Sequence, residues 1–317
     1  MNWLTLTIIS FILFAISNLM DKYLIGKVLS SAKAYTFIVG VLSLFSLSLS
    51  PWFLFWPGYF PVFISILIGV AFLSGAFCLF SALSKGETFR VIVFVGSLSQ
   101  VIYLLFTVFF LDESFGLWQW LGASLLLIGS FFSISISGNK SYIDFLKMKL
   151  TPGNKAFNET IRWSLSAALL FAIYLFGVNY IYHRHDFLNS FILIRIGVFI
   201  TALFFLIRKE DRKEIFASLR GSKNIKYSFD NDKNKLIIFS QSVGAMAALL
   251  QAHAFSIGSV ALISSYQVLQ YIALLAFSLI AVVINPRLFG EKGGSQLLWQ
   301  KISTLAVITA GACLINL

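Results

Sequence analysis

Arg195 is the side chain whose place in the sequence most directly suggests chemistry, because it lies well inside the apolar segment 187–207. The nearest acid on that segment, Asp186, lies nine positions earlier, which is about 13.5 Å along a helix. A planar guanidinium binds a carboxylate or phosphate through two parallel hydrogen bonds. We therefore interpret Arg195 as a candidate ligand for an anionic substrate. Two alternatives stay open: Arg195 caps carbonyl groups of a neighbouring helix, or its side chain extends to the edge of the apolar layer.

Uncharged polar side chains also recur inside apolar segments, and their amides and hydroxyls suit a zwitterion or a sugar. Besides Arg195, the predicted substrate-binding residues are Asn18, Gln100, Tyr103, Tyr174, Asn179, His253, Tyr266, Gln267 and Gln270. The last three and Tyr271 have helical spacings that place them on one face of a helix. The alternative for each residue taken singly is a hydrogen bond between helices. For His253, a proton relay is a further alternative, because histidine side chains commonly transfer protons in proteins.

The sequence lacks the motifs that define common enzyme and metal sites. It contains no His-Glu-x-x-His, no Walker-type glycine loop and no pair of aspartates within an apolar segment. Cys78 and Cys313 both fall inside apolar segments, and the three histidines form no metal-binding pattern. We therefore expect no enzyme activity, no cofactor and no bound metal.

The chain that carries these residues is too apolar to be a soluble domain. Of its 317 residues, 58% are hydrophobic and 12% are charged, whereas soluble domains carry about 25% charged residues. A membrane-spanning segment needs about 20 mostly apolar residues and must be helical, because lipid offers its backbone no hydrogen-bond partner. Ten segments qualify: 3–24, 34–55, 60–83, 89–111, 117–137, 161–182, 187–207, 236–256, 259–284 and 299–316. The sequence predicts an all-α integral membrane protein with ten transmembrane helices.

The distribution of the basic residues predicts the orientation of these helices. Of 24 Lys and Arg residues, Arg195 lies within a segment and Arg184 in an even-numbered loop, and the other 22 lie in or beside odd-numbered loops. Because cytoplasmic loops collect Lys and Arg, we predict cytoplasmic odd-numbered loops and both termini outside. The net charge of +11 therefore belongs to loops and does not indicate a nucleic-acid partner. The most basic loop, 208–235, is interpreted as a solvated connection, with anionic lipid head groups or a partner protein as alternatives.

The two halves of the chain follow the same order of features. Each has a glycine loop, an apolar helix with a glutamine, an acidic turn, a Trp-Gln pair and an apolar helix with a glycine. In the first half these are Gly86, Gln100, Asp112, Glu113, Trp118, Gln119 and Gly129; in the second they are Gly258, Gln270, Glu291, Trp299, Gln300 and Gly311. We predict a first five-helix repeat at 1–137, a basic cytoplasmic linker at 138–160 and a second, inverted five-helix repeat at 161–317.

Ten helices in two inverted halves with this closing pattern resemble the drug/metabolite transporter superfamily, in particular its EamA-like ten-helix members. The resemblance implies that helices one, three, four, six, eight and nine surround a substrate cavity, and that helices five and ten stand apart as a scaffold. Smaller four-helix relatives carry a glutamate in helix one that exchanges protons for cationic drugs. Here that region has Asn18 and, further along, Asp21 beside Lys22, which argues against the same mechanism.

These observations predict a secondary transporter, with export as the favoured direction, of a small polar metabolite such as an amino acid or another carboxylate. It would work by alternating access between the inverted halves. The alternatives are a flippase for lipids or lipid-linked head groups, a membrane-embedded enzyme, and a non-transporting receptor. The expected partners are a small-molecule substrate and the lipid bilayer. We expect a monomer or homodimer in the bacterial cytoplasmic (inner) membrane.

Overall fold

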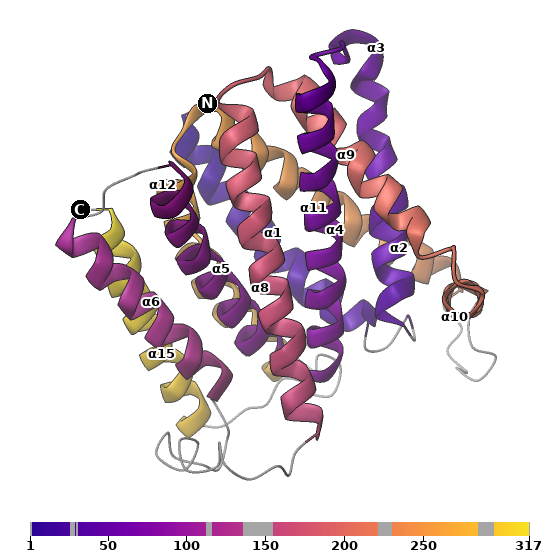
Figure 1. Ribbon diagram of the computed structural model, residues 1–317. Coiled ribbons are helices and arrows are strands. Elements are labelled where there is room, and N and C mark those ends of the chain that lie inside the picture. Colours follow the sequence, from indigo (N-terminus) through magenta and orange to yellow (C-terminus); the bar gives the residue numbers. More distant parts are fainter. Residues whose placement is uncertain are drawn as a thin grey trace.

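The computed structural model of the chain describes residues 2–25, 29, 31–111, 116–135, 155–220, 230–284 and 295–316, and no residue in these ranges lies in a β-strand (Figure 1). The first half contains α1 (Trp3–Tyr23), α2 (Ala32–Leu42), the 3₁₀-helix η2 (Ser43–Leu49), α3 (Ser50–Phe53), α4 (Tyr59–Lys85), α5 (Thr88–Leu111) and α6 (Leu117–Ser135). The second half contains α8 (Lys155–Tyr182), α9 (Phe187–Phe204), α10 (Lys209–Arg220), α11 (Asp230–Ile257), α12 (Val260–Ser265), α13 (Val268–Ile284) and α15 (Ser295–Ile315).

Ten helical segments in the described part of the chain are long and apolar enough to cross a membrane. α2, η2 and α3 together form the second of these spans, and α12 and α13 together form the ninth. Each span coincides with one of the ten segments predicted from the sequence. The prediction of an all-α fold with ten helices that are long and apolar enough to cross a membrane is therefore confirmed for the described residues, with boundaries that differ by a few residues.

Polar caps and one glycine fix several helix ends. The Ser31 hydroxyl accepts a hydrogen bond from the backbone N–H of Lys33 at 3.2 Å before α2, and the Asp186 carboxylate accepts one from Asn189 at 2.9 Å before α9. Such caps satisfy amide groups that the first helical turn leaves without a partner. Gly58, directly before α4, has a φ of 108°, which residues with a side chain rarely adopt. These local signals end the first, second and sixth loops of the chain.

The spans form one bundle in which helices of the two halves interleave (Figure 1). α4 packs against α8 and α9, α1 packs against α11, and α5 packs against α8. The backbones of α4 and α9 come close at Gly69 and Gly197, where a Cβ atom on Gly69 would lie 2.6 Å from the backbone nitrogen of Val198. Small residues allow this close approach between helices in a membrane.

The last spans of the two halves, α6 and α15, pack against each other at one side of the bundle (Figure 1). Their backbones meet at two glycines: a Cβ atom on Gly122 would lie 2.6 Å from the carbonyl oxygen of Gly311. Gly311, which ends the second of the two matching sequence patterns, takes part in this contact directly. Gly129, which ends the first pattern, packs against Ile308 of α15.

Two predictions about the connections between helices need correction. α8 begins at Lys155, so the end of the predicted linker 138–160 is helical, because a helix continues beyond the apolar layer while its backbone hydrogen bonds persist. The loop 208–235 contains the helix α10, which is polar and so escapes a search for apolar segments. Residues 136–154 and 221–229 lie outside the described residues, as do Asp112, Glu113 and Glu291.

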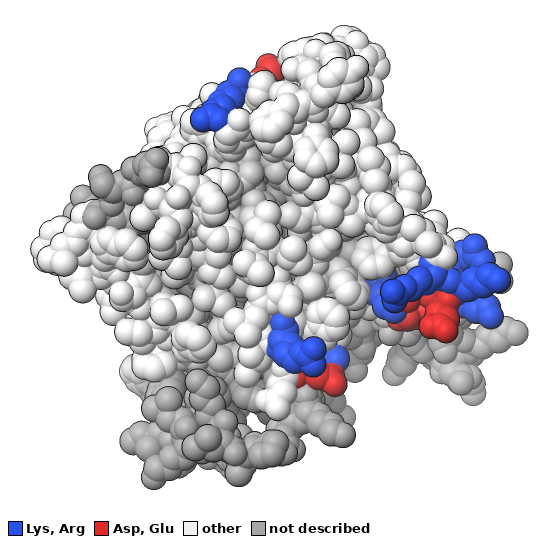
Figure 2. Space-filling view, in the orientation of Figure 1, with Lys and Arg blue, Asp and Glu red and all other residues white. Residues whose placement is uncertain are grey.

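Charged side chains lie toward the ends of the bundle on the face drawn in Figure 2, with an uncharged band between them. The densest group of blue and red atoms on this face covers the position of α10. The uncharged band is the pattern expected of a surface that contacts lipid.

Candidate functional site

A cavity of about 550 Å³ lies between helices of the two halves. Its wall is formed by α1, α2, η2, α4, α5, α8, α9, α11 and the region where α12 meets α13. Among the described residues, α6 and α15 contribute nothing to this wall, as expected for the fifth and tenth helices. The second and seventh helices, which the family resemblance left out of the wall, do contribute to it. The volume falls within the range of about 300–1,000 Å³ that small-molecule sites occupy.

Five of the ten predicted binding residues line this cavity. They are Asn18, Tyr174, Arg195, Gln267 and Gln270. They come from α1, α8, α9 and the ninth span, so the fold brings together side chains that are far apart in the sequence. The cavity is a candidate binding site because these donors and acceptors converge on a mainly aromatic and aliphatic wall.

Arg195 reaches the cavity from α9 with its guanidinium near two aromatic rings. The guanidinium carbon lies 4.8 Å from the ring centroid of Phe191 and 5.4 Å from that of Phe72 on α4. An aromatic face attracts a cation at such distances. The ion pairs of the described residues do not include Arg195, and its guanidinium donates no hydrogen bond to a carbonyl group among them. The aromatic rings therefore hold the cation in place without neutralising it.

The ninth span is interrupted at Tyr266 and Gln267, between α12 and α13. The backbone N–H of Gln267 bonds to the carbonyl of Ser264 at 3.1 Å, a tighter pattern than that of an α-helix. The Gln267 amide lies beside Gly96 of α5, where a Cβ atom would be 2.6 Å from the amide nitrogen. Gln270 follows one turn later and also lines the cavity. Substrate sites in transporters are commonly built at interrupted helices of this kind.

A buried carboxylate that the predicted set omitted also lines the cavity. Asp21 of α1 is 6% exposed and accepts hydrogen bonds from the hydroxyls of Tyr35 on α2 and Ser240 on α11, the latter at 3.1 Å. The Gln241 amide in turn donates to the Tyr35 hydroxyl. One carboxylate thereby connects three helices. Asp21 could have been predicted as a residue of the site from the sequence, because Asn18 and Asp21 are three residues apart and share a face of α1.

Lys22 does not neutralise Asp21, although the two are adjacent in the sequence. Its ammonium group donates hydrogen bonds to the carbonyl oxygens of Leu83 and Gly86 at the end of α4, the second at 2.7 Å. Consecutive helix residues point about 100° apart, so the two side chains face different neighbours. The carboxylate of Asp21 is therefore surrounded by neutral hydroxyl donors rather than by the adjacent cation.

The cavity is open between η2 and α11. Phe45 of η2 and Met246 of α11 both line it, and they are 76% and 52% exposed. The serine hydroxyls of η2 bond to backbone carbonyls three residues earlier, as in the bond from Ser48 to Phe45 at 2.7 Å. Such local bonds compete with regular helix geometry, which explains the 3₁₀ conformation at this part of the wall.

Gln100 and Tyr103 lie on α5 but do not line the cavity. They are 3% and 2% exposed and belong to the buried interior of the bundle. The Gln100 amide nitrogen has no hydrogen-bond partner among the described residues, and neither does the hydroxyl of Tyr271 on α13. These polar groups therefore lie behind the wall, where the helices pack.

Asn179, His253 and Tyr266 also lie outside the cavity wall. Asn179 and His253 are near the ends of α8 and α11, and the His253 ring lies 5.3 Å from the ring of Phe187. Tyr266 packs edge-on against Trp3, with 5.9 Å between ring centroids. The sequence spacing grouped Tyr266 with the glutamines because it assumed a continuous helix, and the interruption of the ninth span separates them.

Among the described residues, no group of three or more His, Cys, Asp or Glu side chains could hold a metal ion. Cys78 is buried, Cys313 is exposed, and both are free thiols. The residues that line the cavity bring one guanidinium, one carboxylate, several amides, several hydroxyls, and aromatic and aliphatic side chains. This set suits reversible binding of a polar molecule that has an apolar part.

The fold and the cavity define an all-α protein with ten helices long and apolar enough to cross a membrane, among the described residues, and with a candidate binding site between them. No protein-family model matches the sequence, and no curated protein matches it. A solved structure described as "Crystal structure of protein" is similar to this chain with a TM-score of 0.59 and 16% identity, over 98% of this chain and 98% of that chain. At this identity the similarity shows a shared fold that extends over nearly the whole chain.

Proposed function

We propose that this protein is a secondary transporter of a small polar metabolite with an anionic group, such as an amino acid or another carboxylate, and that it favours export. The observation that carries the proposal is Arg195, a cation in the wall of the cavity that forms no ion pair within the described residues. A substrate carboxylate would form an ion pair with the Arg195 guanidinium. The amides of Asn18, Gln267 and Gln270 would bind the remaining polar groups.

The packing of the helices supports the proposal of two inverted halves, 1–137 and 161–317. The first helix of each half packs against the third helix of the other, as α1 does on α11 and α8 on α4. The fourth helix of each half packs against the first helix of the other, in the pairs α5–α8 and α13–α1. This reciprocal pairing fits the resemblance to EamA-like members of the drug/metabolite transporter superfamily, which forms part of the proposal.

One pair of helices departs from this reciprocity and suggests how access alternates. α4 and α9 are in close contact at Gly69 and Gly197, whereas their counterparts α11 and α2 leave the cavity open beside Phe45 and Met246. In the conformation that opens the cavity to the other side of the membrane, we expect α2 to be closed on α11 and α9 to be separated from α4. The hydrogen bond between Gln241 and Tyr35 already bridges α2 and α11 and would guide that closure.

A second candidate function is movement of a lipid or a lipid-linked head group. It is favoured by the opening between Phe45 and Met246, because both residues belong to spans and an opening there leads toward lipid chains. Arg195 would then bind a head-group phosphate instead of a metabolite carboxylate.

The proposal is tested by profiling metabolites in cells and medium with and without the protein, and with an Arg195→Gln variant. We expect one anionic or zwitterionic compound to shift across the membrane with the wild-type protein and to shift at least about tenfold less with the variant, because a charge-assisted bond worth roughly 1.5–3 kcal/mol is lost. The matched control is Arg184→Gln, which removes the same charge from an exposed site beside Tyr180. The control is expected to transport as the wild-type protein does.

Each other outcome has a definite meaning. If the compound moves equally with Arg195→Gln, the anion-binding role of Arg195 is wrong while the transporter proposal stands. If no soluble metabolite moves but the distribution of a lipid between the two leaflets changes, the second candidate replaces the first.

A further inference from the structure

The helix α10 carries two opposite faces that differ in charge. Asp211, Glu214, Ile215 and Ser218 follow the spacing i, i+3, i+4 and i+7, which places them on one side of the helix. Ile215 and Ser218 are 0% and 4% exposed, so this side packs on the protein. The helix is therefore attached through a side that bears two acids.

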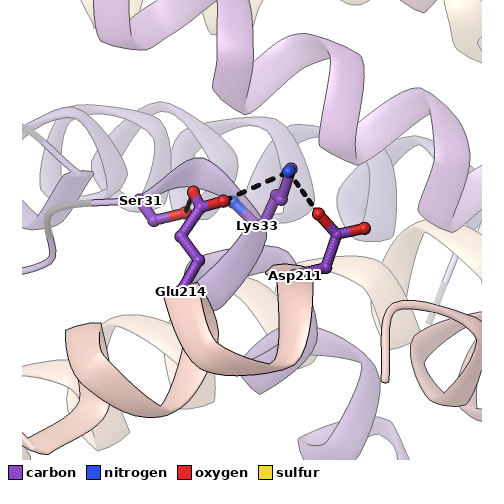
Figure 3. Close-up of polar contacts among 4 residues, drawn as sticks. All are labelled: Ser31, Lys33, Asp211 and Glu214. Carbon is purple, nitrogen blue, oxygen red and sulfur yellow. Dashed lines mark hydrogen bonds and ion pairs between the residues drawn. The ribbon is translucent and has the colours of Figure 1, made fainter. Parts of the chain in front are cut away.

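The acidic side is tied to the start of α2 (Figure 3). The Lys33 ammonium lies 2.6 Å from an Asp211 carboxylate oxygen and 3.1 Å from one of Glu214, and the Ser31 hydroxyl donates a hydrogen bond to Glu214. These contacts use the acids of that side and a cation of α2. Lys209, Arg212 and Lys213 of α10 take no part in this network.

Lys209, Arg212, Lys213 and Phe216 follow the same spacing on the opposite side of α10. All four are exposed, and Phe216 is 45% exposed. The ion pairs of the described residues do not include any of the three cations. This side therefore presents three positive charges around one exposed aromatic ring.

α10 lies directly beside the end of a candidate membrane span. α9 ends at Phe204 and α10 begins at Lys209, so only a short turn separates α10 from a membrane span. In Figure 1, α10 is seen end-on while the spans run lengthwise, so it lies crosswise to them at the edge of the bundle. In Figure 2, the basic atoms at this corner form an exposed patch.

We propose that the basic side of α10 binds the phosphate head groups of anionic phospholipids. Arg and Lys bind lipid phosphates by charge and hydrogen bonding, and an exposed aromatic ring among cations is typical of a helix that lies in the membrane interface. The acidic side holds α2, whose continuation η2 lines the cavity. A lipid on α10 would thus bind a helix that is attached to α2 and, through it, to the wall of the cavity.

The test uses the full-length purified protein and native mass spectrometry with phosphatidylglycerol or phosphatidylcholine of the same chain length. We expect the wild-type protein to retain phosphatidylglycerol in preference to phosphatidylcholine. The triple variant Lys209→Gln, Arg212→Gln, Lys213→Gln should retain phosphatidylglycerol at least about tenfold more weakly, because lipid phosphates then lack their cations. The matched control is Lys85→Gln, Arg162→Gln, Arg184→Gln, which removes the same number of exposed charges elsewhere and should retain the lipid.

A second measurement needs no variant. In wild-type protein, hydrogen exchange of the backbone amides in 209–220 should be slower in phosphatidylglycerol nanodiscs than in phosphatidylcholine nanodiscs. Equal lipid retention by the wild-type protein and the α10 triple variant, or equal exchange in the two lipids, would overturn the proposal. Loss of retention in both triple variants would also overturn it, because the effect would then follow from net charge alone.

Discussion

Arg195 and Asp21, two ionisable side chains in the cavity wall, differ in the kind of group that surrounds them. The Arg195 cation is flanked by the rings of Phe72 and Phe191, which leave its hydrogen-bond donors available to a substrate. The Asp21 carboxylate already accepts bonds from two hydroxyls, which use part of its capacity. We therefore assign substrate binding to Arg195 and a connecting role between helices to Asp21.

Replacement of Asp21 tests this connecting role. Asp21→Ala should destabilise the protein by about 1–3 kcal/mol, because the buried hydroxyls of Tyr35 and Ser240 lose their acceptor. Asp21→Asn keeps an oxygen acceptor in the same place and should lie closer to the wild-type protein. The measurement is thermal unfolding of each purified variant in the same detergent. Equal unfolding temperatures for the alanine and asparagine variants would contradict the connecting role.

Two spans contain irregular helix where they border the cavity, and both irregularities are set by local chemistry. In the second span, serine hydroxyls bond to nearby carbonyls and the helix tightens into η2. In the ninth span, Ser264 and Ser265 do the same just before the interruption at Tyr266 and Gln267. Regular helices elsewhere in the bundle act as the frame, and these two irregular segments shape the site.

Substitution of Gly96 tests whether the position of Gln267, at the interruption of the ninth span, matters for transport. An alanine at Gly96 would place a methyl group against the Tyr271 hydroxyl and 2.6 Å from the Gln267 amide nitrogen. We expect Gly96→Ala to displace Gln267, to cost about 1–3 kcal/mol of stability, and to lower transport of the compound found by metabolite profiling. Unfolding temperature and transport are measured on the same preparations.

The control for this substitution is Gly75→Ala, in the interior of α4. The three atoms nearest to its methyl group would be side-chain atoms of Leu170 and Phe171 at 3.3 Å, and these can shift. We expect near wild-type stability and transport for this control. If Gly96→Ala behaved in the same way, the packing of Gln267 against α5 would have no part in the site.

The distribution of the basic residues predicts how the bundle is oriented in the membrane. The end of the bundle with α10 is predicted to be cytoplasmic. Trp56, in the loop before α4, and Tyr59, the first residue of α4, would then be outside, where aromatic side chains contact the opposite interface; Trp56 is 64% exposed.

Cysteine labelling checks this orientation. In a background with Cys78→Ser and Cys313→Ser, Trp56→Cys should react with a membrane-impermeant thiol reagent on intact cells. Lys213→Cys should react only after the cells are permeabilised, because α10 is predicted to be cytoplasmic. The background protein without added cysteine is the control and should stay unlabelled. The reverse pattern would show that the charge distribution had predicted the wrong orientation.

The ten candidate spans could be predicted from the sequence, because each needs about 20 apolar residues regardless of its neighbours. Arg195 could also be predicted as a site candidate, because a cation in an apolar segment stands out locally. Packing between helices, in contrast, brings Arg195, Gln267 and Gln270 to one cavity with Asp21, while Gln100 and Tyr103 face the packed interior. Hydropathy fixes where a helix crosses the membrane, whereas the rotation of the helix depends on which helices it packs against. The attachment of α10 to α2 also depends on such contacts between distant residues, which no local spacing encodes.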